Sequence, residues 1–423
     1  MGKKRAVVVG LGMAPPPLSG AVLTKVAREK LLKYDAHERQ YIVTVLGEES
    51  HVAYNRVGLT SSLRAPPSRK PYDEASASLG YHIDTKVTYI NSASKTVTCE
   101  NGDIVPYDIL VLATGSQASL PRHTPGWDAE GVFVYRTIDD LVSLIGFSAG
   151  RKGSTGCVVG VGLLGLEAAK AMMDLESFSS VKLIERNGWV LSRQLDQEAG
   201  AMAVQQVRHL GLDVMLSKRV REIKVDDANH VAGVVFEDGQ ELLCSTVCFA
   251  IGIAPRDELA RVSGFDYVRR GGGIATVGLL DAGRDEKAEV FAFNLTQAKL
   301  HAPRVFKRPD LSTKLKFLGV NVASFGDFFA DRDGPAQEIN PFQNIYKKYI
   351  FTSDGEYLLG GMMVGDTNDY IKVVPMVKNI KELHVPPSQP SSAPKRTATA
   401  TTATTCPKTH RSVPATTSPK PTL

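Results

Sequence analysis

The sequence of 423 residues has few cysteines, few histidines and no long apolar run. Its five cysteines are scattered, which excludes a disulfide framework or a paired-cysteine metal site, and its nine histidines show no metal-ligand spacing. No apolar stretch reaches the roughly 18–20 residues that a membrane helix needs. The start, Met1–Arg5, lacks the pattern of a signal peptide. We therefore expect a soluble, cytoplasmic protein with neither a metal site nor a membrane partner.

The formal net charge of +5 is concentrated at the C-terminal end. Residues 389–423 contain five basic residues and no acid, so residues 1–388 are close to neutral. Because no basic stripe is left for a phosphate backbone, we expect no nucleic-acid partner. The same segment is dominated by Thr, Ala, Pro and Ser without an apolar period, which predicts a disordered tail.

Before the tail, short apolar strands alternate with helix-like stretches. This alternation predicts parallel sheets with crossover helices, an α/β fold in which glycine loops follow the first strand of two separate units. We expect strands at 6–10, 41–47, 155–162, 181–185 and 213–217, and helices near 22–34, 163–175 and 196–211. Residues 220–252 predict an antiparallel set with turns at 226–229 and 237–240.

The second glycine loop is the strongest local motif. It follows an apolar strand and opens a helix, and its GxGxxG spacing predicts a tight turn, a close approach of pyrophosphate and close helix packing. The next strand ends in Glu185, which is placed for an adenosine ribose, and Arg186 could accommodate a 2′-phosphate, so NADH and NADPH both stay open. The candidate residues of the loop are Gly160, Gly162, Leu163, Leu164 and Gly165.

The first glycine loop is incomplete. Gly10 and Gly12 follow a strand, but Pro15 occupies the third glycine position, and proline has no N–H for a phosphate. The acidic pair Glu48–Glu49 begins 33 positions after Pro15, against the usual separation of about 20. This loop is therefore either a weakened phosphate site or a remnant that no longer holds phosphate.

Two further strands end in small residues. Residues 107–116 form an apolar strand that ends in Ala-Thr-Gly, at Thr114 and Gly115, and residues 247–252 end in Gly252. Small residues at these ends allow a flavin or a nucleotide to approach the backbone closely.

These motifs, in this order, resemble the FAD/NAD(P)H reductases that contain two dinucleotide-binding domains. Longer strings resemble the N-terminal reductase region of fungal assimilatory nitrite reductases: HVAYNRVGLTS, GLLGLEAAKAMMDLE, VASFGDFFADRDGP and YLLGGMMVGDTNDYIKVVPMVKN. The resemblance covers most of residues 4–388. It implies an FAD that accepts a hydride from NAD(P)H, with the chemistry carried by the flavin, so that no catalytic side chain is named.

The resemblance also implies the binding residues. For FAD they are Gly10, Gly12, Glu48, Asn55, Arg56, Val87, Thr114 and Gly115. Arg56 is either a pyrophosphate or ribose contact or a solvated arginine, and Val87 either pairs with the adenine or is a core valine. For NAD(P)H they are the second loop with Glu167, Glu185, Arg186 and Gly252. Glu167 either approaches the nicotinamide or is an acid favoured by the helix dipole.

The chain departs from the family pattern at three segments. The region after the first glycine loop and residues 63–78 are replaced by proline-rich sequence. Residues 271–297 run past the place where the family has a strand ending in Gly-Asp or Gly-Glu, and nothing there matches the acid that holds the flavin ribityl chain, which puts FAD binding in doubt. The iron–sulfur and siroheme modules are also absent.

The expected organisation is two Rossmann-like, three-layer domains followed by a small α+β interface domain and the tail. The FAD-binding domain is discontinuous and the NAD(P)-binding domain is inserted within it; the ranges are 1–125 with 250–300 for FAD, 126–249 for NAD(P), 301–388 for the interface domain and 389–423 for the tail.

Two functions are compatible with these features. The first is an FAD-dependent NAD(P)H oxidoreductase, the electron-input part of a nitrite reductase of nitrate assimilation without the iron–sulfur and siroheme part. The alternative is a flavin-free, non-catalytic fragment that binds NAD(P) or associates with the full-length enzyme. A homo-oligomer is also possible in either case.

Overall fold

A computed structural model describes most of the chain up to residue 383. The described residues are 2–11, 34–35, 40–51, 54, 59, 79–265, 284–297, 301–305, 312–317, 320–330, 336–340 and 343–383. Several predictions concern residues outside this set: most of the helix near 22–34, the prolines of the first loop, residues 271–283 of the departing segment 271–297, the tail, and the site residues Gly12, Asn55 and Arg56.

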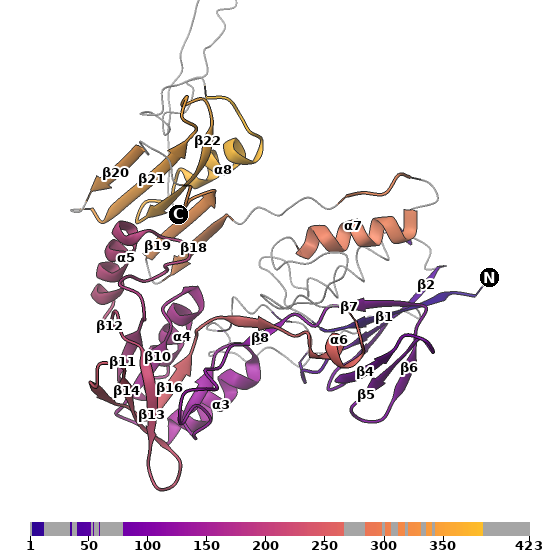
Figure 1. The fold of residues 1–423 in the computed structure, drawn as a ribbon, viewed down its shortest axis with the longest axis horizontal. Coiled ribbons are helices and arrows are strands. Elements are labelled where there is room, and N and C mark those ends of the chain that lie inside the picture. The colour runs from indigo at the N-terminus through magenta and orange to yellow at the C-terminus, as the bar shows by residue number, and fades with distance from the viewer. Residues whose placement is uncertain are drawn as a thin grey trace, which may run out of the picture.

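The first sheet unit is built on a parallel sheet of order β3-β2-β1-β7, with β3 at Leu79–His82, β2 at Tyr41–Leu46, β1 at Lys4–Val9 and β7 at Ile109–Leu112. Side chains alternate between its two faces. Ala6 and Val8 pack with Ala292 of helix α7 (Arg284–Gln297), while Val7 and Val9 face the opposite layer. That layer is the antiparallel sheet of β4 (Val87–Asn91), β5 (Thr96–Cys99) and β6 (Ile104–Pro106) (Figure 1).

The second sheet unit repeats this plan. Its parallel sheet has the order β12-β11-β10-β16-β9, from Asp213–Met215, Phe178–Ile184, Ser154–Val159, Thr246–Phe249 and Val132–Val134. Val158 packs with the helices α3 (Ile138–Ala149), α4 (Leu163–Asp174) and α5 (Gln197–His209). Cys157 faces the antiparallel layer of β13 (Val220–Val225), β14 (Val231–Phe236) and β15 (Glu241–Leu243). The layers therefore match the predicted α/β class.

One element of this unit corrects the sequence analysis. We expected residues 220–252 to form a single antiparallel set, but only β13 to β15 are antiparallel. Strand β16 (Thr246–Phe249) instead pairs in parallel with β10 and with β9. All four of its residues are buried, as in a central strand covered on both faces, whereas Leu243 of β15 is 76% exposed.

An antiparallel ribbon joins the two units. Strand β8 (Ser116–Ala118) leads out of the first unit, and β17 (Ile253–Pro255) leads back into it before the short helix α6 (Glu258–Val262). Figure 1 shows β8 running between the two units. The chain therefore crosses between them along two paired strands.

The third sheet unit lies within residues 301–388 and is antiparallel. Its order is β18-β19-β22-β21-β20, from Thr313–Phe317, Val320–Gly326, Leu358–Val364, Ile345–Phe351 and Ala336–Asn340, followed by helix α8 (Tyr370–Lys378). Phe351, Met362 and Met363 are buried in its core, whereas Tyr357 is half-buried.

The third unit is held against α5 of the second unit through Asp196. The Asp196 carboxylate accepts hydrogen bonds from the Tyr346 hydroxyl at 2.8 Å and from Lys348 Nζ at 2.9 Å. Figure 1 shows β19 lying over α5. Among the described residues, no helix is long and apolar enough to cross a membrane.

Candidate nucleotide sites

The glycine loop of the second unit begins at Gly160, directly after β10. Its φ of +96° lies in the left-handed region that favours glycine. Its N–H donates to the Ile184 carbonyl at 2.8 Å, and a Cβ at this position would come within 2.7 Å of the Ala250 carbonyl oxygen. The chain therefore turns in a space that only glycine fits.

Helix α4 starts at Gly162, its N-cap. A Cβ on Gly165 would lie 1.9 Å from the Gly160 carbonyl oxygen, so the helix packs directly on the loop. A Cβ on Gly162 would meet no atom within 4 Å, so this residue borders open space. Leu163 and Leu164 form the first turn, where backbone N–H groups have no intrahelical partner. This arrangement suits an anion such as pyrophosphate.

Glu185 follows β11 at the same edge of the sheet, but its carboxylate is turned inward. Its oxygens accept hydrogen bonds from the backbone N–H of Val161 at 2.8 Å and of Asn187 at 3.0 Å, and the residue is 7% exposed. Arg186, the next residue, is exposed. Glu185 therefore braces the glycine loop, and the next residue, Arg186, offers its charged side chain to solvent.

Gly252 and Glu167 lie at the same end of the second unit. Gly252 has a φ of +122°, and no atom lies within 4 Å of a Cβ built on it. Glu167 is in the second turn of α4, where burial raises the pKa of its carboxyl to about 7. No described residue gives it a hydrogen bond or an ion pair. A carboxyl that is desolvated without a partner is typical of a functional position.

The first unit repeats the turn of the second. Gly10 has a φ of +116° and donates its N–H to the Leu46 carbonyl at 2.8 Å. A Cβ on Gly10 would lie 2.2 Å from the Ala113 carbonyl oxygen. Ala113 N–H bonds the Val9 carbonyl, as Ala250 bonds Val159, both at 2.8 Å. The incomplete loop therefore retains the glycine turn.

The hydrogen bonds also align the residues that follow β2 and β11. Gly47 accepts from Thr85 N–H at 2.7 Å and donates to the His82 carbonyl at 2.8 Å. Glu185 makes the same pair of bonds, both at 2.9 Å, with Lys218 and Met215. Gly47 thus takes the position of Glu185, and Glu48 takes that of Arg186.

Glu48 has a partner that the sequence did not indicate. Its carboxylate forms an ion pair with the Arg256 guanidinium. The Arg256 backbone also holds the end of β7, because its N–H donates to the Gly115 carbonyl at 3.0 Å and its carbonyl accepts from Thr114 Oγ1 at 2.8 Å. The arginine lies 208 positions from Glu48 in the chain, too far for any spacing rule to connect them.

The remaining predicted residues differ in exposure. Gly115 has a φ of +68° and borders open space. Val87 starts β4, pairs with Cys99 and is 8% exposed within the core of the first unit, so its side chain is a core valine.

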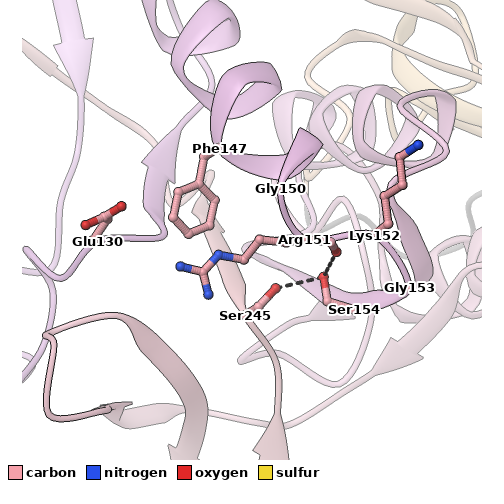
Figure 2. A pocket seen from close by; sticks show the side chains of 8 residues that line it. All are labelled: Glu130, Phe147, Gly150, Arg151, Lys152, Gly153, Ser154 and Ser245. Carbon is pink, nitrogen blue, oxygen red and sulfur yellow. Dashed lines mark hydrogen bonds between the residues drawn. The ribbon is translucent and has the colours of Figure 1, made fainter.

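A cavity of about 650 Å³ lies at the opposite edge of the second sheet. It is lined by Arg151, Ser154 and Ser245, among others, and Figure 2 shows the Arg151 guanidinium beside the Phe147 ring. Ser154 begins β10, so the cavity is at the amino end of the strands. Nucleotides in such folds bind at the carboxyl end, so this cavity is not part of the candidate sites. Among the described residues, no group of His, Cys, Asp or Glu could hold a metal ion.

Comparison with known proteins gives a family and a fold. The family model described as pyridine nucleotide-disulphide oxidoreductase matches residues 5–292. The chain is 48% identical to a nitrite reductase [NAD(P)H] of Emericella nidulans over 92% of its own length and 39% of the relative's. It is 50% identical to a nitrite reductase [NAD(P)H] of Neurospora crassa, over 90% of its own length and 38% of the relative's.

Thus the chain spans about two fifths of the length of these curated relatives. Among solved structures, it is similar to a ferredoxin reductase for the CYP199A2 system from Rhodopseudomonas palustris, with a TM-score of 0.72 and 18% identity. That match covers 92% of this chain and 98% of the other, and it shows the fold alone.

Proposed function

Because the chain belongs to the pyridine nucleotide-disulphide oxidoreductase family, we propose that it is an FAD-dependent NAD(P)H oxidoreductase. In the proposal, the second sheet unit binds NAD(P)H and the first binds FAD, with the domain limits expected from the sequence. The observation that carries it is the repeated frame: both units place a left-handed glycine at the end of the first strand and a space-bordering glycine, Gly115 or Gly252, at the end of a neighbouring strand.

The second unit fits a nicotinamide dinucleotide. The pyrophosphate would lie at the first turn of α4 beside Gly162, where a Cβ would meet no other atom. Glu185 keeps the loop in shape through Val161, and the exposed Arg186 is available to a 2′-phosphate. Glu167 would lie toward the nicotinamide end, holding a proton that it can exchange near neutral pH.

The first unit fits a flavin dinucleotide at the corresponding edge. Gly10 keeps the turn, Gly115 leaves room for a ligand, and Glu48 with Arg256 provides charged groups. When bound, FAD would supply the redox chemistry by accepting a hydride from NAD(P)H. The protein's part is to hold one dinucleotide at the carboxyl edge of each parallel sheet, in the two units that the β8–β17 ribbon joins.

We further propose that the chain corresponds to the electron-input part of a nitrite reductase of nitrate assimilation. Two relatives named nitrite reductase [NAD(P)H] support this, each matched over less than two fifths of its length. Cytoplasmic location, a homo-oligomer and association with a full-length enzyme stay predictions.

The test is a visible absorption spectrum of the purified chain, before and after NADPH is added under nitrogen. We expect flavin bands that bleach on addition of NADPH. A protein that stays colourless after incubation with FAD, yet still binds NADPH, would contradict the flavin half of the proposal and favour the flavin-free alternative.

A further inference from the structure

We propose that Arg256 binds the diphosphate of the flavin dinucleotide at the carboxyl edge of the first sheet. This inference rests on the flavin-binding part of the proposed function, and it assigns a binding role to a residue that lies at the end of the connection between the two units.

The Arg256 backbone is fixed at the end of β7. Arg256 directly follows β17, its N–H donates to the Gly115 carbonyl at 3.0 Å, and its carbonyl accepts from Thr114 Oγ1 at 2.8 Å. Both bonds join the returning strand to the Thr-Gly end of β7. The Cα position of the arginine is therefore set by the sheet that would hold the flavin.

The side chain reaches from β7 to β2. Its Nη1 pairs with the carboxylate of Glu48, which lies two residues beyond the last residue of β2. Since β1 lies between β2 and β7 in the sheet, the side chain must pass the carboxyl end of β1, where Gly10 turns. In dinucleotide-binding folds the pyrophosphate lies at that turn.

The guanidinium is also partly desolvated and incompletely bonded. Its side chain is 28% exposed, and its Nε is buried without a hydrogen-bond partner among the described residues. Burial lowers the pKa of Arg256 from its ordinary value, but a guanidinium remains charged at neutral pH. A buried N–H donor on a permanent cation suits a phosphate oxygen as its acceptor.

The sequence of the first loop explains why such a cation is needed. In the second unit the phosphate can use the N–H groups at the start of α4. In the first unit, Pro15, Pro16 and Pro17 stand near the corresponding positions, and they have no N–H to donate. A guanidinium at the carboxyl edge of this sheet replaces part of that lost donor set, and Glu48 keeps it in place before the ligand binds.

The test measures FAD affinity by flavin fluorescence with the full chain, at low and high ionic strength, about 0.05 and 0.5 M. We expect Arg256→Gln to weaken FAD binding about 10- to 100-fold at low salt, and the loss to shrink at high salt because a charge–phosphate contact is screened. Arg256→Lys keeps the charge but not the fork of donors, so we expect a loss of several fold.

Arg261→Gln is the matched control, because Arg261 is an exposed arginine on the nearby helix α6. It should leave FAD affinity unchanged, and thermal unfolding without flavin checks that each variant folds. Equal losses of FAD affinity at both salt concentrations would overturn the inference in favour of a structural role. Unchanged or tighter FAD binding by both Arg256 variants would also overturn the inference, because the Arg256–Glu48 ion pair would then only shield the carboxyl edge of the sheet from solvent. A wild-type chain that binds NADPH but no FAD would overturn the flavin half of the proposed function together with this inference.

Discussion

The first and second sheet units use one hydrogen-bond frame for two different chemistries at the edge of the sheet. In both, the glycine after β1 or β10 bonds the end of β2 or β11, and the alanine after β7 or β16 bonds the end of β1 or β10. The two units diverge at one position in that frame. The second unit has Glu185 there, and the first has Gly47.

This difference changes which side chain packs against the glycine loop at the carboxyl edge of the sheet. In the second unit the Glu185 carboxylate enters the loop and accepts the Val161 N–H. In the first unit Leu11 takes the place of Val161, and a Cβ on Gly47 would lie 2.6 Å from the Leu11 Cβ. An apolar contact thus replaces the buried acid. In the first unit the acid is instead the next residue, Glu48, where it can pair with an arginine or contact a ligand.

The largest expected effect separates two glycines of the second loop. Gly165→Val places a side chain 1.9 Å from the Gly160 carbonyl, so we expect a loss of stability of about 3 kcal/mol or more together with loss of NAD(P)H binding. A Cβ on Gly162 has no atom within 4 Å, so for Gly162→Val we expect a normal unfolding transition and NAD(P)H affinity reduced at least about 100-fold.

Urea unfolding and NADPH titration of both variants provide the measurement. Gly188→Val is a control, because Gly188 is exposed and a Cβ on it would lie 3.9 Å from the Ser217 hydroxyl oxygen, an ordinary contact distance. Unchanged NADPH affinity in Gly162→Val would show that the nucleotide does not bind at this loop. The two glycine loops could then no longer be compared as nucleotide sites.

The repeated frame was largely predictable, because it depends on local patterns. Apolar strands followed by glycines predicted β1, β10 and the helix α4, and the charge and spacing of the second loop placed Gly160, Gly165 and Glu185 at one edge. What stays a prediction is the role of each residue toward a bound dinucleotide.

Long-range partners were not predictable. The pairing of Glu48 with Arg256 and the position of β16 in the parallel sheet both depend on how distant segments meet. Likewise, the inward turn of Glu185 depends on a backbone N–H, which no residue pattern reveals. Hydrophobic periodicity and glycine spacing describe the turn, whereas the electrostatics of the edge arise from tertiary contacts.

The next effect is a pH dependence confined to the second unit. Burial raises the pKa of Glu167 from 4.5 to about 7, so the folded state binds more protons than the unfolded state between these values. The contribution of Glu167 to stability should therefore be most favourable below about pH 4.5 and fall as the pH rises through about 7, by up to about 3 kcal/mol. Counting from the first glycine, the first unit has Pro17 at this position, which carries no charge.

Glu167→Gln should remove this loss of stability and be more stable than the wild type at pH 8. Urea unfolding across this pH range measures it, with Glu237→Gln as the control at an exposed position. An identical pH profile in wild type and Glu167→Gln would show that the Glu167 carboxyl is solvated in the folded protein.

A double-mutant cycle tests the apolar contact that distinguishes the first unit. Gly47→Ala places a Cβ against Leu11, so we expect a loss of about 1–3 kcal/mol in the free energy of unfolding. Leu11→Gly removes the clashing group, so the double variant should recover part of that loss and give a coupling energy of about 0.5–3 kcal/mol. Additive effects, measured by urea unfolding, would mean that Leu11 does not fill the place of the Glu185 side chain.

The smallest effect exchanges the residues that follow the divergent position. Arg186→Glu gives the second unit the acid that the first unit has at Glu48. Because Arg186 is exposed while Glu185 is turned inward, we expect NADPH affinity to fall about tenfold and NADH affinity to change less than about twofold. Titration of both nucleotides measures the ratio, with Arg221→Glu, an exposed arginine on β13, as the control. Equal losses of affinity for the two nucleotides would show that Arg186 does not contact the 2′-phosphate. The two units would then differ in the buried contact at Glu185 or Gly47, and not in the charge that the next residue presents to a ligand.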